Sequence, residues 1–133
     1  MAIEIYRNDY MATTVDGERL TLHWDREEPN DAHASATARA VTAAIDAYLG
    51  SHASERLAVL VDLLVVKKTF PRATAAYTAW MLGHRARIRG GAFVTKSLLL
   101  RASVAAALIV PGLTMKGFSE LLEAQAFLDK LPG

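Results

Sequence analysis

A short apolar run in the middle of the chain is its most regular hydrophobic pattern. In Leu57–Asp62, both alternating sets of side chains are apolar until the aspartate. A short run that is rich in branched residues and apolar on both faces is typical of a central strand covered on both sides, and its length argues against a buried helix. Lys67 and Lys68 follow in a loop that Phe70-Pro71 closes. We therefore expect a buried strand, a basic loop and the start of a helix.

Before this strand, the pattern predicts a β-hairpin and one long helix. Period-two alternation predicts strands at Ile3–Tyr6, Met11–Val15 and Arg19–Trp24. Asp16-Gly17 suits a tight turn between the last two strands, in which both central residues need a positive φ. Apolar positions three and four residues apart predict a helix from Asp31 to about Leu49, with Asn30 or Asp31 as its N-cap.

After the central strand, helices and strands are expected to alternate. Pro71 fits a first helical turn, and the helical spacing continues to Ile88, so Gly90-Gly91 is expected to break this helix. The remaining expected elements are a strand at Ala92–Thr95, a helix from Leu98 to about Val110 capped by Ser97, a strand at Thr114–Phe118 and a final helix capped by Ser119. The helix from Leu98 is apolar almost all round, which indicates burial on more than one side.

This order of elements predicts an α/β protein. Its mixed β-sheet would have an N-terminal hairpin, parallel central strands and about four helices, since strands that alternate with helices usually lie parallel. With 133 residues, the chain is expected to form a single domain, residues 1–133.

Composition narrows the class of protein. A hydrophobic content of 52% with 22% charged residues is typical of a globular chain rather than a disordered one. The absence of cysteine excludes disulfides, a thiolate nucleophile and sulfur metal ligands. The first residues lack the basic region and apolar core of a signal peptide, and no apolar run approaches the roughly 20 residues that span a bilayer. We therefore expect a cytoplasmic protein.

The charge pattern predicts a basic edge. The net charge is only +1, yet every formally charged residue between Leu63 and Ser119 is basic. The helix starts near Pro71 and Ser97 should lie at one edge of the sheet if their strands are parallel, and helix N-termini attract anions. The alternative is that these are ordinary solvated charges. The candidate ligand- or partner-binding residues are Lys67, Lys68, Thr69, Arg72, Lys96, Ser97 and Asp62.

Several segments together carry a resemblance to a known family. They are LAVLVDL at Leu57–Leu63, the helix from Pro71 to Trp80, AFV at Ala92–Val94, and an ending with Met115-Lys116-Gly117-Phe118, Glu123-Ala124 and Phe127-Leu128. With the order of elements, they resemble the SpoIIAA-like STAS domains, especially the small stand-alone bacterial STAS/SEC14-like branch. The resemblance covers nearly the whole chain and implies a SpoIIAA-like fold with a role in binding.

One feature of that family is missing from this chain. The best-known members are anti-sigma-factor antagonists that bind a partner kinase and are switched by phosphorylation of a serine after the VDL strand. The resemblance places that serine near Pro71 or Arg72, and neither accepts a phosphate. Thr69 and Thr74 carry the nearest hydroxyls. The resemblance therefore implies a binding module without the usual switch.

No residue set indicates a reaction. None of the four histidines pairs with another at metal-ligand spacing, and no nucleophile elbow or phosphate-binding glycine loop occurs. Asp62 ends the central strand, where open α/β sheets place ligand groups, but it can equally accept hydrogen bonds from the next loop. A small enzyme would have to use Asp62 and His84 in a cleft at the C-terminal edge of the sheet.

We therefore expect a non-enzymatic binding or regulatory module without metal or cofactor. Its partner would be a protein or a small anionic or lipidic ligand. Nucleic acid is not expected, because aromatic residues do not interleave the basic ones. An apolar cavity beneath Leu98–Val110 would favour a lipid-like ligand, whereas a flat basic edge would favour a protein. The apolar content and the same helix also make a homodimer possible.

Overall fold

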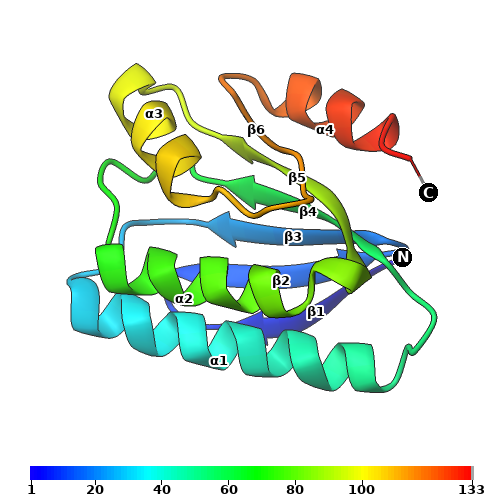
Figure 1. The fold of residues 1–133 in the computed structure, drawn as a ribbon. Helices are drawn as coiled ribbons and strands as arrows, with labels where there is room; N and C mark the ends of the chain where they lie inside the picture. The colour runs from blue at the N-terminus through cyan, green and yellow to red at the C-terminus, as the bar shows by residue number, and fades with distance from the viewer. Residues whose placement is uncertain (133) are drawn as a thin grey trace.

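Six strands form one mixed sheet in the computed structural model, which describes residues 1–132 (Figure 1). The strands are β1 (Ala2–Arg7), β2 (Met11–Asp16), β3 (Arg19–Trp24), β4 (Leu57–Asp62), β5 (Ile88–Val94) and β6 (Met115–Phe118), and they lie side by side in chain order. The first three strands pair antiparallel, and β3 to β6 pair parallel. The predicted mixed α/β architecture is therefore confirmed.

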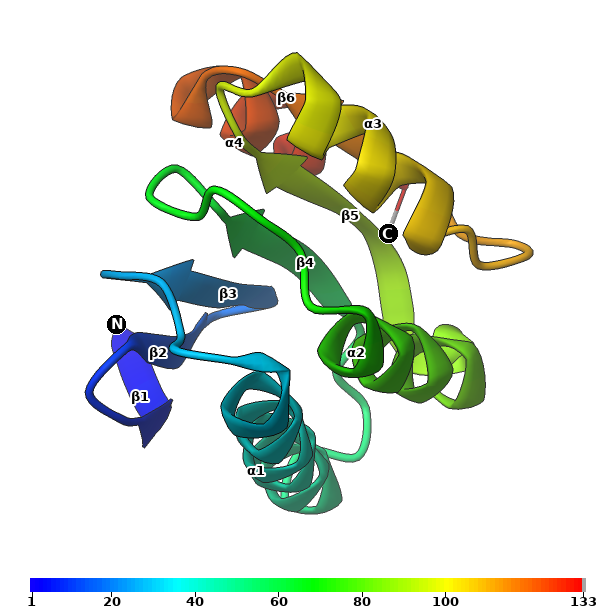
Figure 2. The same ribbon diagram turned by 90° about the vertical axis from the view of Figure 1, so that its left-hand side faces the viewer.

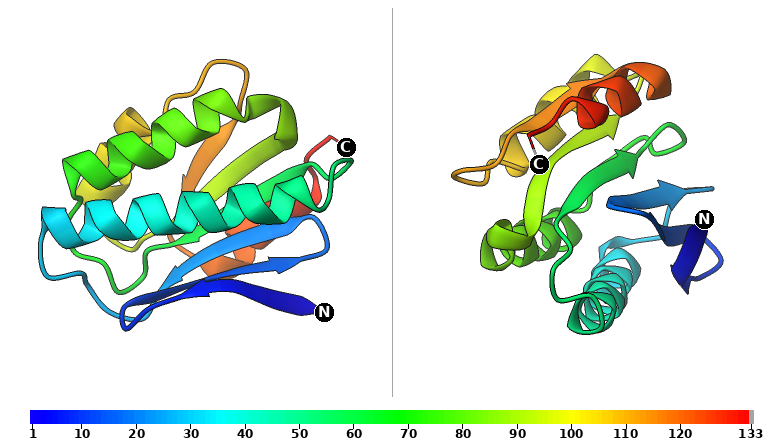
Figure 3. Two further views of the ribbon diagram at one scale, coloured as in Figure 1. Left: turned by 90° about the horizontal axis from the view of Figure 1, so that it is seen from below. Right: turned by 90° about the vertical axis from the view of Figure 1, so that its right-hand side faces the viewer.

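The four helices divide unequally between the two faces of the sheet. They are α1 (Asp31–Gly50), α2 (Pro71–Gly83), α3 (Leu98–Ala107) and α4 (Leu121–Asp129), with a short 3₁₀ helix, η1, at Arg85–Arg87. Apolar residues of α1, α2 and α3 join one core cluster, and those of α4 join a separate one. Figure 2 shows α1, α2 and α3 along one face of the curved sheet. In Figure 3 (left), α1 and α2 run side by side across that face.

Alternation along β4 shows why the central strand is apolar on both sides. Leu57 and Val59 belong to the core beneath α1, α2 and α3. Ala58 and Leu60 belong to the opposite core, beneath α4. Successive side chains of a strand point to opposite faces of the sheet. When helices cover both faces, every position is buried, and the sequence is apolar throughout instead of alternating between apolar and polar residues. The predicted buried central strand is thereby confirmed.

The hairpin turn differs by one residue from the prediction. Asp16 pairs with Arg19, so the central residues of the turn are Gly17 and Glu18. Gly17 has a φ of 60°, and no residue other than glycine has a positive φ within residues 1–132. A positive φ at the first central position alone is the pattern of a type II′ turn, which needs glycine only there. The expected turn with Asp16 at positive φ is wrong.

Gly90 and Gly91 lie inside β5, and the predicted helix break at this pair is wrong. The helix α2 already ends at Gly83, and Ile88 begins the strand. A Cβ atom on Gly91 would lie 2.5 Å from the Cε atom of Met115, which belongs to the neighbouring strand β6. Glycine is therefore needed here because a side chain crosses the strand closely, rather than because the chain turns.

Helix α3 also differs from its prediction. It is buried on one side only, because Leu98 is 75% exposed and Leu99 is 79% exposed, whereas Leu100 is buried. Its predicted N-cap is confirmed, since Ser97 Oγ accepts from the backbone N–H of Leu100 at 3.1 Å. The analogous cap predicted for α4 is wrong, because Glu120 occupies that N-cap position and Ser119 lies outside it.

The long helix α1 begins as predicted. Asn30 is its N-cap, and the side-chain oxygen accepts from the backbone N–H of His33 at 2.8 Å. Among the helices of residues 1–132, none combines the length and the apolar character needed to cross a membrane.

Candidate functional site

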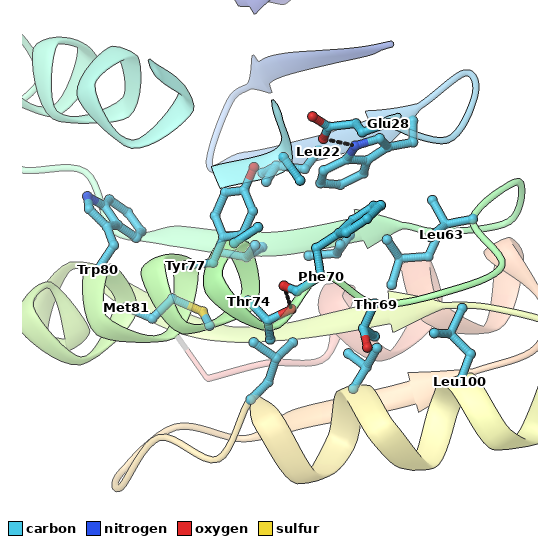
Figure 4. Close-up of a pocket in the computed structure, with 18 of the residues that line it drawn as sticks. Leu22, Glu28, Leu63, Thr69, Phe70, Thr74, Tyr77, Trp80, Met81 and Leu100 are labelled. Atoms are coloured by element: carbon cyan, nitrogen blue, oxygen red, sulfur yellow. Dashed lines mark hydrogen bonds between the residues drawn. The ribbon is translucent and has the colours of Figure 1, made fainter. Parts of the chain in front are cut away.

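A small apolar cavity lies between α2, α3 and the sheet (Figure 4). Its volume is about 120 Å³. The strands contribute Leu20, Leu22, Trp24, Val59 and Val61; the helix α3 contributes Leu100, Val104 and, just beyond it, Leu108; and α2 and the preceding loop contribute Leu63, Val66, Phe70, Ala73, Tyr77, Trp80 and Met81. The cavity thus lies beneath α3, the helix under which a cavity would favour a lipid-like ligand.

Helical spacing explains how two helices line the same space. On α3, Leu100 and Val104 are four residues apart, so both point to one side of the helix. On α2, Ala73 and Tyr77 are also four apart, and Met81 follows at the same interval. The alanine is small where α2 begins, and the larger residues follow one and two turns later.

One buried carboxylate lines this otherwise apolar wall. Glu28 is only 5% exposed. Its Oε1 accepts from the indole Nε1 of Trp24 at 2.9 Å, and its Oε2 lies 2.8 Å from Nδ1 of His33. A buried charge is tolerated only when it is hydrogen-bonded or paired, and both carboxylate oxygens have such a partner here. Glu28 is therefore held in one orientation.

The side chain of Tyr77 also lines the cavity, and it ends in a polar group that is buried beside it. Its hydroxyl is shielded from solvent, and within residues 1–132 it has no hydrogen-bond partner. Burial raises the pKa of Tyr77 well above its ordinary value, and the charge of Glu28 raises it further. The group is therefore a neutral O–H donor. In Figure 4, the ring reaches from α2 towards Leu22, and the hydroxyl ends on the side of the site where Glu28 lies.

Two predicted site residues line the cavity. They are Lys68 and Thr69, in the loop that follows β4. Lys68 is exposed, with its Nζ atom 5.4 Å from the centre of the Phe70 ring, and therefore marks the side of the cavity that is open to solvent. Thr74 also lines the cavity, and its hydroxyl donates to the carbonyl oxygen of Phe70 at 3.0 Å.

The other predicted basic residues meet acidic partners instead. Arg72 Nε lies 3.5 Å from Asp31 Oδ2, and Lys96 Nζ lies 3.8 Å from Glu120 Oε1. The backbone N–H of Lys67 donates to Glu27 Oε1 at 2.6 Å. The starts of α2 and α3 do follow parallel neighbouring strands, as expected. The edge is nevertheless a mixture of both charges, because acids distant in sequence fold against it.

Asp62 hydrogen-bonds to its own loop and to a histidine. Its Oδ1 accepts from the backbone N–H of Leu64 at 3.1 Å, and its Oδ2 lies 2.8 Å from Nδ1 of His23. The other ring nitrogen of His23 lies 3.0 Å from Asp25 Oδ1. The sequence interpretation in which Asp62 holds the following loop is thus confirmed. Among residues 1–132, no group of three or more His, Cys, Asp or Glu side chains could hold a metal ion.

The predicted cleft with Asp62 and His84 does not form. His84 follows the end of α2, stacks on Trp80 and lies 2.9 Å from Asp46 Oδ1. It precedes β5, whose first residue pairs with the first residue of β4, whereas Asp62 is the last residue of β4. A whole strand, at about 3.3 Å per residue, separates the two side chains. The helix that connects the strands runs back across the sheet, which separates them.

Sequence reasoning missed the polar pair of the cavity. Glu28 lies in Asp25–Asn30, a charged, proline-containing connection between a predicted strand and a predicted helix, and nothing in the sequence distinguishes it from its charged neighbours. Tyr77 belongs to the helical spacing between Pro71 and Ile88, and that spacing does not reveal a hydroxyl without a partner. One signal for a buried acceptor was available. Trp24 shares the apolar face of its predicted strand with Leu20 and Leu22, and a buried indole N–H needs a hydrogen-bond acceptor.

Comparisons of this chain with profiles of protein families, with curated proteins and with solved structures found no match. The SpoIIAA-like assignment therefore stays a prediction, and the function has to be argued from the site itself.

Proposed function

We propose that this protein is a non-enzymatic binding module of SpoIIAA-like fold that holds a small apolar ligand in the cavity between α2, α3 and the sheet. The observation that supports the proposal is the cavity itself, whose lining is almost wholly apolar. Ligand sites are typically concave and apolar with a few placed polar groups, and in open α/β sheets they lie near the carboxyl ends of the strands. The lining fits the first description, and the loop residues after β4 bring one part of the cavity to the carboxyl end of that strand.

The volume limits the size of the ligand. An engineered apolar cavity of about 150 Å³ binds benzene, whereas pockets for drug-sized molecules measure about 300–1,000 Å³. The present cavity, at about 120 Å³, has room for one ring or a short alkyl chain. Of the ligand classes expected from the sequence, a short hydrophobic molecule is favoured over a long-chain lipid.

The test is to fill the cavity from α3 and leave the rest of that helix unchanged. Leu100→Trp places a large ring in the cavity, and Leu99→Trp places the same ring on the exposed side of α3. Benzene is the probe, and binding is followed by calorimetry and by saturation-transfer NMR. We expect the wild type and Leu99→Trp to bind benzene with a Kd of about 1 mM or lower, and Leu100→Trp to bind it at least about tenfold more weakly.

Two results would contradict this proposal. One is that benzene does not bind to the wild type. The other is that it binds equally well to both tryptophan variants, because occupancy of the cavity would then be irrelevant. Thermal unfolding of each variant separates loss of binding from loss of the fold.

Self-association is a second candidate function, and the exposed side of α3 favours it. Leu98, Leu99 and Ile109 are each more than 70% exposed, and no exposed residue of α3 is charged. The one charged residue of that helix, Arg101, donates from Nη2 to the carbonyl oxygen of Thr95 at 3.2 Å. Grouped apolar side chains on a surface mark interaction sites, and a second copy of the chain would offer the same patch in return.

A further inference from the structure

We infer that the segment between β4 and α2, residues 63–70, is a movable strap that admits the ligand to the cavity, and that Glu27 latches it closed. The inference rests on the proposed function and adds how access to the same cavity is controlled. Opening of the strap sets the rates at which the ligand enters and leaves, whereas the apolar walls behind it set the affinity.

The strap forms a wall of the cavity that has no regular secondary structure. Five of its eight residues line the cavity: Leu63, Val66, Lys68, Thr69 and Phe70. Apart from Glu28 and Leu108, the other lining residues belong to strands and helices. In Figure 4, Leu63 lies at the end of the site opposite Trp80, so the strap closes one end of the cavity. Loops open at a lower free energy than packed helices and strands, which makes this end the favoured entrance.

Few hydrogen bonds hold the strap to the rest of the molecule. At its start, the backbone N–H of Leu63 donates to the carbonyl oxygen of Val94 at 2.9 Å. The backbone N–H groups of Leu64 and Val66 also donate, but their acceptors lie two and three residues earlier in the chain. These local bonds shape the turn without attaching it to another element. The strap is therefore tied to the sheet at its start and only loosely along its length.

Within residues 1–132, Glu27 supplies the one hydrogen bond that ties the middle of the strap to a distant segment. Its Oε1 atom accepts from the backbone N–H of Lys67 at 2.6 Å. Glu27 belongs to the connection between β3 and α1, and the adjacent Glu28 lines the cavity, so the latch joins two segments that border the same space. The bond is exposed, so water replaces either partner when it breaks. It therefore holds the strap without a buried group that would be left unpaired on opening.

The experiment separates the rates of binding from the affinity. Benzene is the probe, its association and dissociation rate constants are measured by NMR relaxation dispersion, and its Kd is measured by calorimetry. The proteins are the wild type, Glu27→Ala, which removes the acceptor, and Glu27→Gln, which keeps an oxygen acceptor at the same place. The matched control is Glu123→Ala, which removes an exposed carboxylate from α4.

We expect both rate constants to rise by about 3- to 10-fold in Glu27→Ala, which is the range of one hydrogen bond, while Kd changes by less than about twofold. A strap that is closed most of the time multiplies both rate constants by the same opening equilibrium, so their ratio is preserved. The rise should be smaller in Glu27→Gln. The rate constants of Glu123→Ala should equal those of the wild type.

Hydrogen exchange provides a second readout that does not depend on a ligand. The backbone N–H groups of Leu64 and Val66 have partners other than Glu27, yet we expect them to exchange about 3- to 10-fold faster in Glu27→Ala, because the whole strap opens together. The N–H of Ala92, inside β5, should keep its wild-type rate and so report an intact fold. Unchanged exchange at Leu64 and Val66 would overturn the role of the latch.

The outcomes distinguish the inference from the proposed function. If benzene binds and Glu27→Ala raises only the dissociation rate constant, the strap is a fixed wall, and its role as an entrance is overturned while the cavity remains a binding site. If both rate constants are the same in all the proteins, the ligand enters elsewhere, and the inference fails alone. If benzene does not bind to the wild type, the proposed function fails, and the inference fails with it.

Discussion

Two buried polar groups, the Glu28 carboxylate and the Tyr77 hydroxyl, distinguish the site at the scale of single residues. Glu28 has partners for both carboxylate oxygens, whereas the hydroxyl of Tyr77 has none within residues 1–132. A satisfied buried group adds rigidity to a wall, and an unsatisfied one lowers the free energy of unfolding by about 1–3 kcal/mol. Of the two groups, the unpaired hydroxyl is therefore the one that costs stability.

The alkaline stability of the protein tests the environment of Tyr77. Its pKa is raised in the folded state by burial and by Glu28, whereas in the unfolded chain it titrates near pH 10. Above pH 10, the unfolded chain loses a proton that the folded protein keeps, so the free energy of unfolding falls as pH rises. The contribution of one such group is at most about 1.4 kcal/mol per pH unit.

We expect Tyr77→Phe to reduce this alkaline loss by up to that amount in urea unfolding between pH 10 and 12. The comparison at pH 7 is the control, since Tyr77 is protonated in both states there, and the variant should be as stable as the wild type or more stable. Parallel pH profiles for the two proteins would show that the hydroxyl is not shielded.

At the scale of elements, the close pairing of β5 with β6 depends on a glycine. Gly91 faces the Met115 side chain and the Val59 carbonyl oxygen, which would lie 2.5 Å and 3.1 Å from an added Cβ. The methionine end is flexible and can move aside, but the backbone carbonyl of β4 cannot move without disturbing the sheet. Because Gly91 has no side chain, β4, β5 and β6 can pair closely where the Met115 side chain lies against β5.

Gly91→Ala should reduce the free energy of unfolding by about 1–3 kcal/mol through overpacking, measured by urea denaturation. Met115→Ala in the same chain should recover part of that loss. The matched control is Gly83→Ala, where nothing lies within 4 Å of an added Cβ, and which should be neutral or stabilising by about 0.4–1 kcal/mol. If the two alanine variants have equal stability, the close contact at Gly91 has no energetic consequence.

At the scale of the whole molecule, the helices cover the sheet unevenly and leave one apolar surface open. Three helices share one face with the cavity, and α4 alone covers the parallel strands on the other (Figures 1 and 2). The helix α3 contributes Leu100 and Val104 to the core and leaves Leu98 and Leu99 exposed, and Ile109, just beyond its end, is exposed as well. The same helix therefore takes part in both proposed functions, with opposite sides.

Self-association through α3 has a direct test by sedimentation velocity. Leu98→Glu with Leu99→Glu places like charges on the patch at the start of α3, so we expect a wild-type dimer to dissociate at least about tenfold more readily. Leu122→Glu is the matched control, because this residue is equally exposed but lies on α4, and it should leave the dimer unchanged. A wild type that sediments as a monomer at high concentration would contradict the proposal.

The elements that sequence analysis predicted correctly are those with a local cause. The strand β4 follows from its doubly apolar run, and the start of α1 follows from the cap at Asn30. The cap at Ser97 is equally local. Gly90 and Gly91 were misinterpreted because a glycine pair has the same local signature in a turn and in a crowded strand, and only the neighbouring Met115 distinguishes the two.

The site depended on contacts between segments far apart along the chain. The sequence shows a run of basic residues but not the acidic residues that folding brings to them. Asp31 pairs with Arg72, and Glu120 pairs with Lys96. The cavity exists because α2 and α3, which are separated by β5, are held over the same strands. Periodicity along one segment specifies which side chains are buried. It does not specify the distance between two buried surfaces, and that distance creates the cavity and isolates the hydroxyl of Tyr77.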